Sequence, residues 1–358
     1  MKSVRHSPRS GVPHRSSGLI PVILIILLFP LDCPAQNQLL PVIVEGKAGY
    51  INQSGQLVIP PRFLESHPFS DGLALVRQAD DRHPSDSRPG YINPEGTFHE
   101  IPGADMLGEY REGLARARFP RSGLFLRLNL CFIDLNGSVV VRSTYDDAGD
   151  FSEGLAWVEE RVHILFILIS DTFGYIDRTG ALAIPTRFEG AGDFSEGLAN
   201  VTLKGKKGYI NRKGELVIAP RFDGVGAFSA GLAPVRIGDK WGFVDTLGSI
   251  VIPPAFEDAR PFVDGLAAVK SGGDWGFIRR SGETAIAPQY REVSGFHQGL
   301  SAVQIEGKWG YIDTTGALRI RPQFDYAMAF WGGAAMVEVA HRRGYIDLTG
   351  KYIWQPGD

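Results

Sequence analysis

The stretch Lys308-Trp309-Gly310-Tyr311-Ile312-Asp313 decides the fold, because variants of it recur along the whole chain. We take its glycine as the anchor of a repeat unit. The chain holds nine such units, with anchors at Gly49, Gly90, Cys131, Gly174, Gly208, Gly242, Gly276, Gly310 and Gly344. The first three spacings are 41, 41 and 43 residues, and the others are all 34. A period of this size indicates structural repeats stacked around a continuous core.

Three further positions keep a constant offset from the anchor. A glycine follows it by six residues in every unit, and an aromatic residue by 20 and a second glycine by 23 in the first eight. Because these offsets do not change, the extra residues of the early units must follow the Gly-Leu-Ala step. They are residues 77–89, 118–130 and 159–173. Insertions placed in this way are expected to lie in loops on one side of the array.

This motif resembles the bacterial WG-repeat family over residues 39–358. The closest copies are Lys240-Trp241-Gly242-Phe243-Val244-Asp245 and the stretch around Gly310. Departures are visible, since Trp precedes the anchor only at Trp241, Trp275 and Trp309, and Cys131 replaces one anchor. The resemblance implies a repeat architecture more clearly than a biochemical activity.

Each regular unit reads as three short strands. Two alternating runs are joined by a polar turn, Asp-x-x-Gly makes a second turn, and a third run ends at a proline such as Pro220. A loop of about 15 residues would then carry the aromatic residue into the next unit. The sequence thus predicts an all-β array of three-stranded antiparallel repeats over residues 36–358. We expect an open solenoid or superhelix, because no strand is left over to close a ring; the alternative is a closed, propeller-like ring.

Residues 1–35 read as a secretory signal peptide. Basic residues precede an apolar run from Leu19 to Phe29, and a small residue, Ala35, stands before Gln36. The run is shorter than the roughly 20 residues of a membrane span, so we expect a secreted, periplasmic or cell-envelope protein with no stable span in the mature chain. An uncleaved amino-terminal anchor and lipidation at Cys33 are the alternatives.

Composition and motifs favour a binding protein over an enzyme. The formal net charge is −3, and four of the basic residues lie within residues 1–35, so nucleic acid is not an expected partner. No nucleophile elbow, metal-ligand spacing or phosphate loop occurs. We therefore predict no catalytic residues, no metal and no cofactor.

Aromatic residues in three adjacent units form the predicted binding site. Alternation places the two aromatics of each unit on one strand face, and the set is Trp241, Phe243, Trp275, Phe277, Trp309 and Tyr311. They either fill the core between units or bind sugar rings or a quaternary ammonium.

The hypothesis that follows is an exported, non-enzymatic scaffold that binds a protein or a cell-envelope glycan. A second place to look is the apolar stretch 162–169, which either extends a hairpin under cover or forms an exposed lip. The alternative function is a carbohydrate-active hydrolase with its site between the insertions.

Overall fold

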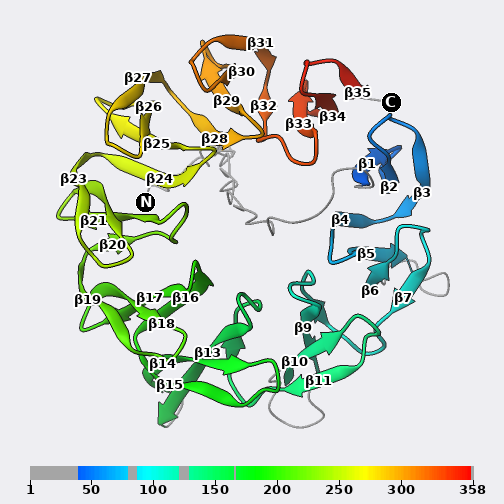
Figure 1. Cartoon of the computed structure of the whole chain (residues 1–358). Coiled ribbons are helices and arrows are strands. Elements are labelled where there is room, and N and C mark those ends of the chain that lie inside the picture. Colours follow the sequence, from blue (N-terminus) through cyan, green and yellow to red (C-terminus); the bar gives the residue numbers. More distant parts are fainter. Residues whose placement is uncertain (1–38, 80–86, 121–128, 165–166, 356–358) are drawn as a thin grey trace, which may run out of the picture. The chain divides into compact units, whose positions relative to one another are not determined.

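Nine β-sheets stand around a common axis as the blades of a closed propeller (Figure 1). The computed structural model describes residues 39–79, 87–120, 129–164 and 167–355, all within the unit Ala35–Asp358. Every regular element in these residues is a strand. We number the blades in chain order and the strands of each blade from the axis outward.

The strands have the following bounds. Blade 1 contains β1 (Leu40–Val44), β2 (Lys47–Ile51) and β3 (Leu57–Phe63). Blade 2 contains β4 (Glu65–Ser70), β5 (Leu73–Ala79), β6 (Ser87–Ile92) and β7 (Phe98–Glu100). Blade 3 contains β8 (Met106–Leu107), β9 (Leu114–Phe119), β10 (Asn129–Asp134) and β11 (Val139–Arg142). Blade 4 contains β12 (Asp147–Ala148), β13 (Leu155–Ile164), β14 (Ile167–Asp177) and β15 (Leu182–Phe188). Blade 5 contains β16 (Gly190–Ser195), β17 (Leu198–Leu203), β18 (Lys206–Asn211) and β19 (Leu216–Phe222).

The remaining blades follow the same order. Blade 6 contains β20 (Gly224–Val225), β21 (Leu232–Ile237), β22 (Lys240–Asp245) and β23 (Ile250–Phe256). Blade 7 contains β24 (Asp258–Val263), β25 (Leu266–Ser271), β26 (Asp274–Arg279) and β27 (Thr284–Tyr290). Blade 8 contains β28 (Val293–His297), β29 (Leu300–Ile305), β30 (Lys308–Asp313) and β31 (Leu318–Phe324). Blade 9 contains β32 (Tyr326–Ala327), β33 (Ala334–Val339), β34 (Arg342–Asp347) and β35 (Tyr352–Trp354).

The expectation of three-stranded repeats in an open array is wrong. Eight blades have four antiparallel strands, and the extra strand is the innermost one, formed by the segment expected to be a loop. This strand is easily missed because it is as short as two residues, as in β20 and β32. Glycine and proline also interrupt its alternation, and both are depleted in strands.

The anchor glycine makes room for a β-bulge. The register between β18 and β19 shifts on either side of Gly208, and a Cβ on that glycine would lie 2.4 Å from the carbonyl oxygen of Ile218. In blade 3 the pairing runs without a shift past Cys131, from its pair with Arg142 to the next pair. Gly90 in blade 2 is paired in the same regular way, with Glu100.

An aromatic pair joins the blades at eight interfaces. The residue after the anchor packs against the aromatic residue of the next blade's inner segment, with ring centroids 4.6–5.1 Å apart. The pairs are Tyr50–Phe69, Tyr91–Tyr110, Phe132–Phe151, Tyr175–Phe194, Tyr209–Phe228, Phe243–Phe262, Phe277–Phe296 and Tyr311–Phe330. Tilted or edge-on geometries suit the ring quadrupoles. Where the first member is tyrosine its hydroxyl mostly donates to the next inner segment, as from Tyr209 to the carbonyl of Gly226 at 2.7 Å.

Turn contacts tie adjacent blades together on one rim. The turn between the first two strands places two residues at positive φ, such as Glu196 and Gly197, as in the tight turns that favour glycine. The side chain of its first residue accepts a hydrogen bond from the next blade's turn, as from Gly231 N–H to Glu196 at 2.8 Å. The glycine six residues after the anchor also faces the preceding blade, and a Cβ on Gly214 would lie 2.8 Å from Ile184.

The ring closes without a strand shared between the chain ends. Blade 1 has three described strands, and β1 packs directly on blade 9 in a core cluster that includes Val42, Ile51 and Ala334. The hydroxyl of Tyr345 donates to the carbonyl of Pro41 at 2.9 Å. At the matching residue of other blades this carbonyl accepts from the inner strand, as Pro234 does from Gly226 N–H. The ring therefore closes without an additional strand, because side-chain contacts join blade 9 to blade 1.

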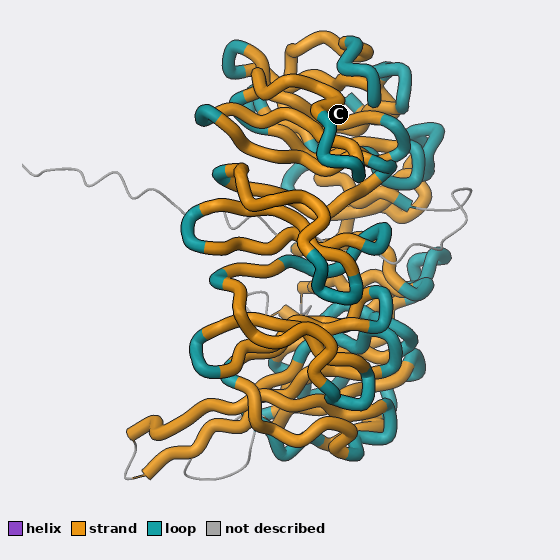
Figure 2. The backbone as a smooth tube through the Cα atoms, turned by 60° about the vertical axis from the view of Figure 1, so that its left-hand side comes forward, coloured by secondary structure: helices purple, strands orange, loops and turns teal. Residues whose placement is uncertain are grey.

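The strands that flank the three insertions occupy matching places in their blades. Each insertion joins the second and third strands of its blade, in the adjacent blades 2, 3 and 4. In blade 4 the insertion lengthens β13 and β14 into a hairpin that extends beyond the other blades (Figure 2). Val162 near its tip is 44% exposed. The side chains of residues 163–169, and the whole of 80–86 and 121–128, lie outside the described residues.

Replacing Phe228 by alanine is expected to lower the free energy of unfolding by about 3–5 kcal/mol, because it leaves a cavity against the buried Tyr209. Urea denaturation followed by circular dichroism measures the change. The matched control is Leu247→Ala, since Leu247 is 82% exposed and should shift stability by less than about 0.5 kcal/mol. Equal effects from the two variants would contradict a structural role for the aromatic pair.

Tyr345→Phe is expected to loosen the seam between blades 9 and 1 by about 1–3 kcal/mol, because it leaves the carbonyl of Pro41 unpaired in a largely buried place. Hydrogen exchange should then speed up in β1 and β34 before it does so in blades 4 to 6. Tyr209→Phe is the control at an interior interface, where exchange in β1 should not change.

Candidate functional site

Four of the six predicted aromatic residues are buried in the core, namely Trp275 and the three that follow the anchors. Phe243, Phe277 and Tyr311 are no more than 1% exposed and are members of the aromatic pairs between blades. Their rings are therefore covered on both sides by protein. The structure brings each of them next to the following blade rather than into a continuous row with its neighbours.

The three tryptophans come directly before the anchor glycines, in the third strands of blades 6, 7 and 8. Trp275 is buried, with the guanidinium of Arg260 4.6 Å from its ring centre, and its indole nitrogen has no hydrogen-bond partner among the described residues. Trp241 and Trp309 are partly open to solvent. Ligand binding at these six positions remains a prediction, and these last two offer the most accessible surface.

A second group of side chains departs from the repeat pattern at the axis of the ring. It consists of three carboxylates on the inner segments and three other polar side chains on the second strands. We call this group the axial polar sector, and its members are Glu109, Arg116, Asp150, Trp157, Asp193 and Asn200. They belong to the adjacent blades 3, 4 and 5, two to each blade.

Glycines in the inner segments let the second-strand side chains reach this position. A Cβ on Gly149 would lie 2.2 Å from the indole nitrogen of Trp157, and one on Gly192 would lie 2.4 Å from the amide of Asn200. Trp157 and Asn200 therefore each lie over a glycine, which has no side chain. In blade 7 the order is reversed, because the inner residue is Arg260 and the second-strand residue is Ala268.

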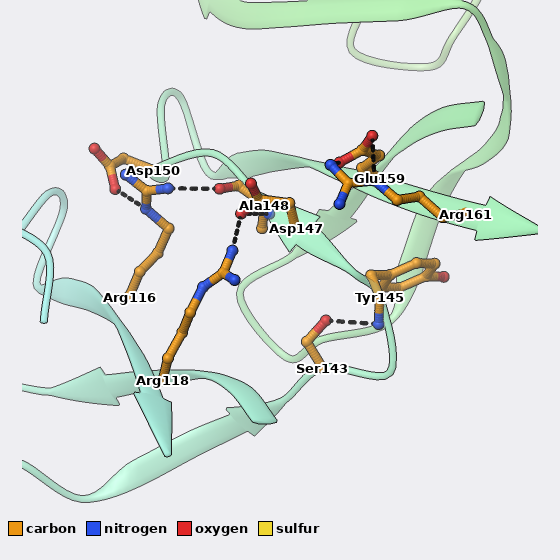
Figure 3. Close-up of polar contacts among 9 residues, drawn as sticks. All are labelled: Arg116, Arg118, Ser143, Tyr145, Asp147, Ala148, Asp150, Glu159 and Arg161. Atoms are coloured by element: carbon orange, nitrogen blue, oxygen red, sulfur yellow. Dashed lines mark hydrogen bonds and ion pairs between the residues drawn. The ribbon is translucent and has the colours of Figure 1, made fainter. Parts of the chain in front are cut away.

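Donors of one blade hold the carboxylates of the next. The guanidinium of Arg116 reaches from β9 to Asp150 at 2.6 Å and also donates to the carbonyl of Ala148 at 2.7 Å (Figure 3). Beside it Arg118 donates to Asp147 at 2.5 Å. The Trp157 side chain acts on Asp193 in the following blade and lowers the pKa of its carboxyl group. The sector is thus held by contacts between blades and not within one sheet.

The electrostatic setting of Asp193 is unusual for an exposed carboxylate. Asp193 is exposed to solvent. The surrounding chain nevertheless raises the pKa of its carboxyl group, and desolvation is the largest cause. The nearby Asp150 raises it further, while Arg116, Trp157 and Arg111 oppose the shift. The carboxyl group is therefore a strong hydrogen-bond acceptor beside two guanidinium groups.

His67 of blade 2 contacts the axial polar sector through Glu109. Its Nδ1 lies 3.3 Å from the carboxylate of Glu109, and its Nε2 lies 3.5 Å from Glu65. The hydrogen bond with Glu109 is the largest cause that raises the pKa of His67, against the effect of burial.

The same positions in the other blades carry small or apolar residues. Those on the inner segments are Pro68, Ala227, Pro261, Gly295 and Ala329, and those on the second strands are Leu75, Pro234, Ala268, Ala302 and Met336. The motif search missed the sector because its members lie far apart in sequence. Alignment of the repeats could have revealed it, because two positions of the unit change from small or apolar to polar residues in three successive units.

Other places in the fold make weaker sites. No group of metal-binding side chains occurs in the parts of the chain that the structure describes. A shallow depression on the rim is lined by Asp264, Arg279 and Thr314, but the Asp264 carboxylate already accepts the Gly299 N–H. Within the described ranges no helix is long and apolar enough to cross a membrane.

Comparison with known proteins agrees with this architecture. The family described as "WG containing repeat" matches residues 49–80, 132–161, 173–206, 208–241, 241–273, 275–309 and 309–339. These segments cover more than half of the chain. The protein belongs to the WG-repeat family. No curated protein matches the sequence.

Solved structures similar to this WG-repeat protein show the fold alone. One described as the eukaryotic initiation factor has a TM-score of 0.63 at 12% identity, covering 88% of this chain and 94% of that one. Apo AztD from Citrobacter koseri has a TM-score of 0.42 at 12% identity, over 78% and 92% of the two chains. Hsv2p from Kluyveromyces lactis has a TM-score of 0.39 at 10% identity, over 70% and 93%.

A pH dependence of stability is expected from His67. Because its pKa is raised in the folded state, its pair with Glu109 stabilises fully below the unfolded pKa of about 6.5. The contribution is lost as the pH rises through the raised value. His67→Gln should therefore lower the unfolding free energy more at pH 5.5 than at pH 8.5, measured in urea. In the control, His341→Gln, the side chain is 99% exposed, and a pH-independent effect of H67Q would contradict the pairing.

Proposed function

We propose that this protein is an exported, non-enzymatic scaffold that binds a protein or a cell-envelope polymer. The axial polar sector is the observation that carries the proposal. It is the place where three adjacent blades replace apolar residues with polar ones at matching positions. A fold that needed only to stack nine blades would keep the apolar residues found there in the other units.

The insertion-bearing blades support the same proposal. Blades 2, 3 and 4 carry the insertions, and blades 3 and 4 also contribute to the axial polar sector. The long β13–β14 hairpin adds a projecting edge to this side of the ring (Figure 2). A large partner could contact these blades and the axis together, which suits an extended ligand better than a small one.

The hydrolase alternative has one supporting observation. Asp150 and Asp193 act on each other electrostatically, and the pKa of Asp193 is raised, as expected for a general acid beside a second carboxylate. Arg116 holds Asp150 at 2.6 Å, which favours a fixed binding wall over a nucleophile. The acids lie on the inner segments and not between the insertions, where the sequence predicts the alternative hydrolase site.

Export is tested on the protein made in cells with its own amino terminus. We expect the mature chain in the periplasmic or extracellular fraction with Gln36 as its first residue, because a signal peptide is removed. Intact mass and amino-terminal sequencing measure this. A cytoplasmic chain that keeps residues 1–35 would contradict export, and a membrane-bound one that keeps them would indicate an anchor.

Binding is tested by affinity capture from cell-envelope extract. The wild type should retain a reproducible protein or glycan, and Arg116→Ala should retain clearly less, because the variant releases Asp150 from its pair. Met336→Ala, at the matching position of blade 9, is the control. Recovery of nothing above the background of an unrelated propeller would refute the scaffold proposal.

A further inference from the structure

The geometry points to a neutral carbohydrate as the ligand of the axial polar sector, held by Asp193, Asn200, Trp157 and the Arg116–Asp150 pair. This inference rests on the proposed binding function and names its ligand. It assigns a sugar-binding site to blades 3 to 5, away from the Trp-Gly motif on which the family resemblance depends.

The charge arrangement disfavours an ionic ligand. Charges of both signs meet at the sector, since Arg116 is paired to Asp150, and since Arg116 and the neighbouring Arg111 both act on Asp193. A cation placed against Asp193 would approach these two guanidinium groups. An anion placed against them would meet Asp150, Asp193 and Glu109. A ligand without net charge avoids both repulsions.

The hydrogen-bonding groups suit a polyhydroxyl ligand. A sugar hydroxyl both donates and accepts, and the sector offers carboxylate acceptors beside guanidinium and amide donors. Asn200 presents an amide over Gly192, the residue that precedes Asp193 in β16.

Trp157 supplies an aromatic surface at the same place. Its indole lies over Gly149, and Phe173 lies beside it with ring centres 5.8 Å apart. Trp157 is half-buried, so part of the indole stays accessible. An aromatic ring beside carboxylate and amide groups matches the two sides of a sugar, which has apolar C–H faces and polar edges.

The arrangement of the sector also fits a chain of sugars. Its three carboxylates come from successive blades and occupy similar positions in each. Two of them have a partner from the preceding blade, His67 for Glu109 and Arg116 for Asp150. Trp157 of blade 4 acts on Asp193 of blade 5 and lowers its pKa. A polymer lying across these blades would meet similar groups several times, which raises its affinity over that of a monosaccharide.

The test is calorimetric titration of the full chain with neutral oligosaccharides, cellohexaose and chitohexaose. Oligogalacturonate serves as the anionic probe and pentalysine as the cationic one. We expect a neutral hexasaccharide to bind and the charged probes not to bind. Asp193→Asn and Asn200→Ala should each weaken binding about tenfold or more, because each removes hydrogen bonds to the ligand.

Matched controls separate binding from folding. Met336→Ala changes the residue of blade 9 that corresponds to Asn200, and it should bind like the wild type. Trp157→Phe keeps an aromatic ring but removes the indole N–H, so it should weaken binding less than Trp157→Ala. Thermal melting of every variant shows whether the propeller is intact, and the comparison uses only variants that melt like the wild type.

The outcomes distinguish this inference from the proposed function. Binding of pentalysine but not of the neutral sugars, or unchanged sugar binding by D193N and N200A, would overturn the assignment of a neutral glycan to this sector. If envelope capture then still recovers a partner, the scaffold function stands with another ligand. Release of shorter sugars during titration, detected by mass spectrometry, would overturn the non-enzymatic part of the proposal.

Discussion

The contact between the aromatic residue after each anchor and the aromatic residue of the next blade is the interaction on which the structure depends. It recurs at eight interfaces with ring centroids 4.6–5.1 Å apart. A single blade cannot bury its aromatic residues, so each is stable only against a neighbour. A fixed distance and orientation at every interface makes each blade turn by a similar amount from the last. Repetition of that rotation brings blade 9 beside blade 1.

The interface between blades 9 and 1 differs from the eight that contain the aromatic pair. Within the described chain no aromatic residue of an inner segment packs on Tyr345 from blade 1; β1 lies there instead, and its Pro41 carbonyl accepts the Tyr345 hydroxyl. Gln53 meanwhile donates to the carbonyl of Gly332 at 2.5 Å, so the turns of blades 1 and 9 are joined across the rim as those of other blades are. Proline removes one N–H from the inner edge of β1, which limits the exposed strand edge. The ring therefore closes through side chains.

The regular arrangement of the blades also explains how the side chains of the axial polar sector are accommodated. The inner segments must leave room for second-strand side chains, and glycines such as Gly149 and Gly192 provide it. In the other half of the ring the matching positions hold residues such as Ala268 and Ala302, which need no partner. The ion pair of Arg116 with Asp150 joins blades 3 and 4, so polar groups of the sector also hold neighbouring blades together.

The sequence by itself determined the repeat, its nine units, its β character and the connection that carries the insertions. These follow from local requirements, since a bulge needs Gly208, a turn with positive φ needs Gly197, and alternation marks the second and third strands. Only the tertiary structure decided the fourth strand, the closed ring and the grouping of Arg116, Asp150 and Asp193. Each depends on the rotation between blades, which arises from the packing of residues in different units. That rotation has no local signature, and so the open array expected from strand counting became a propeller.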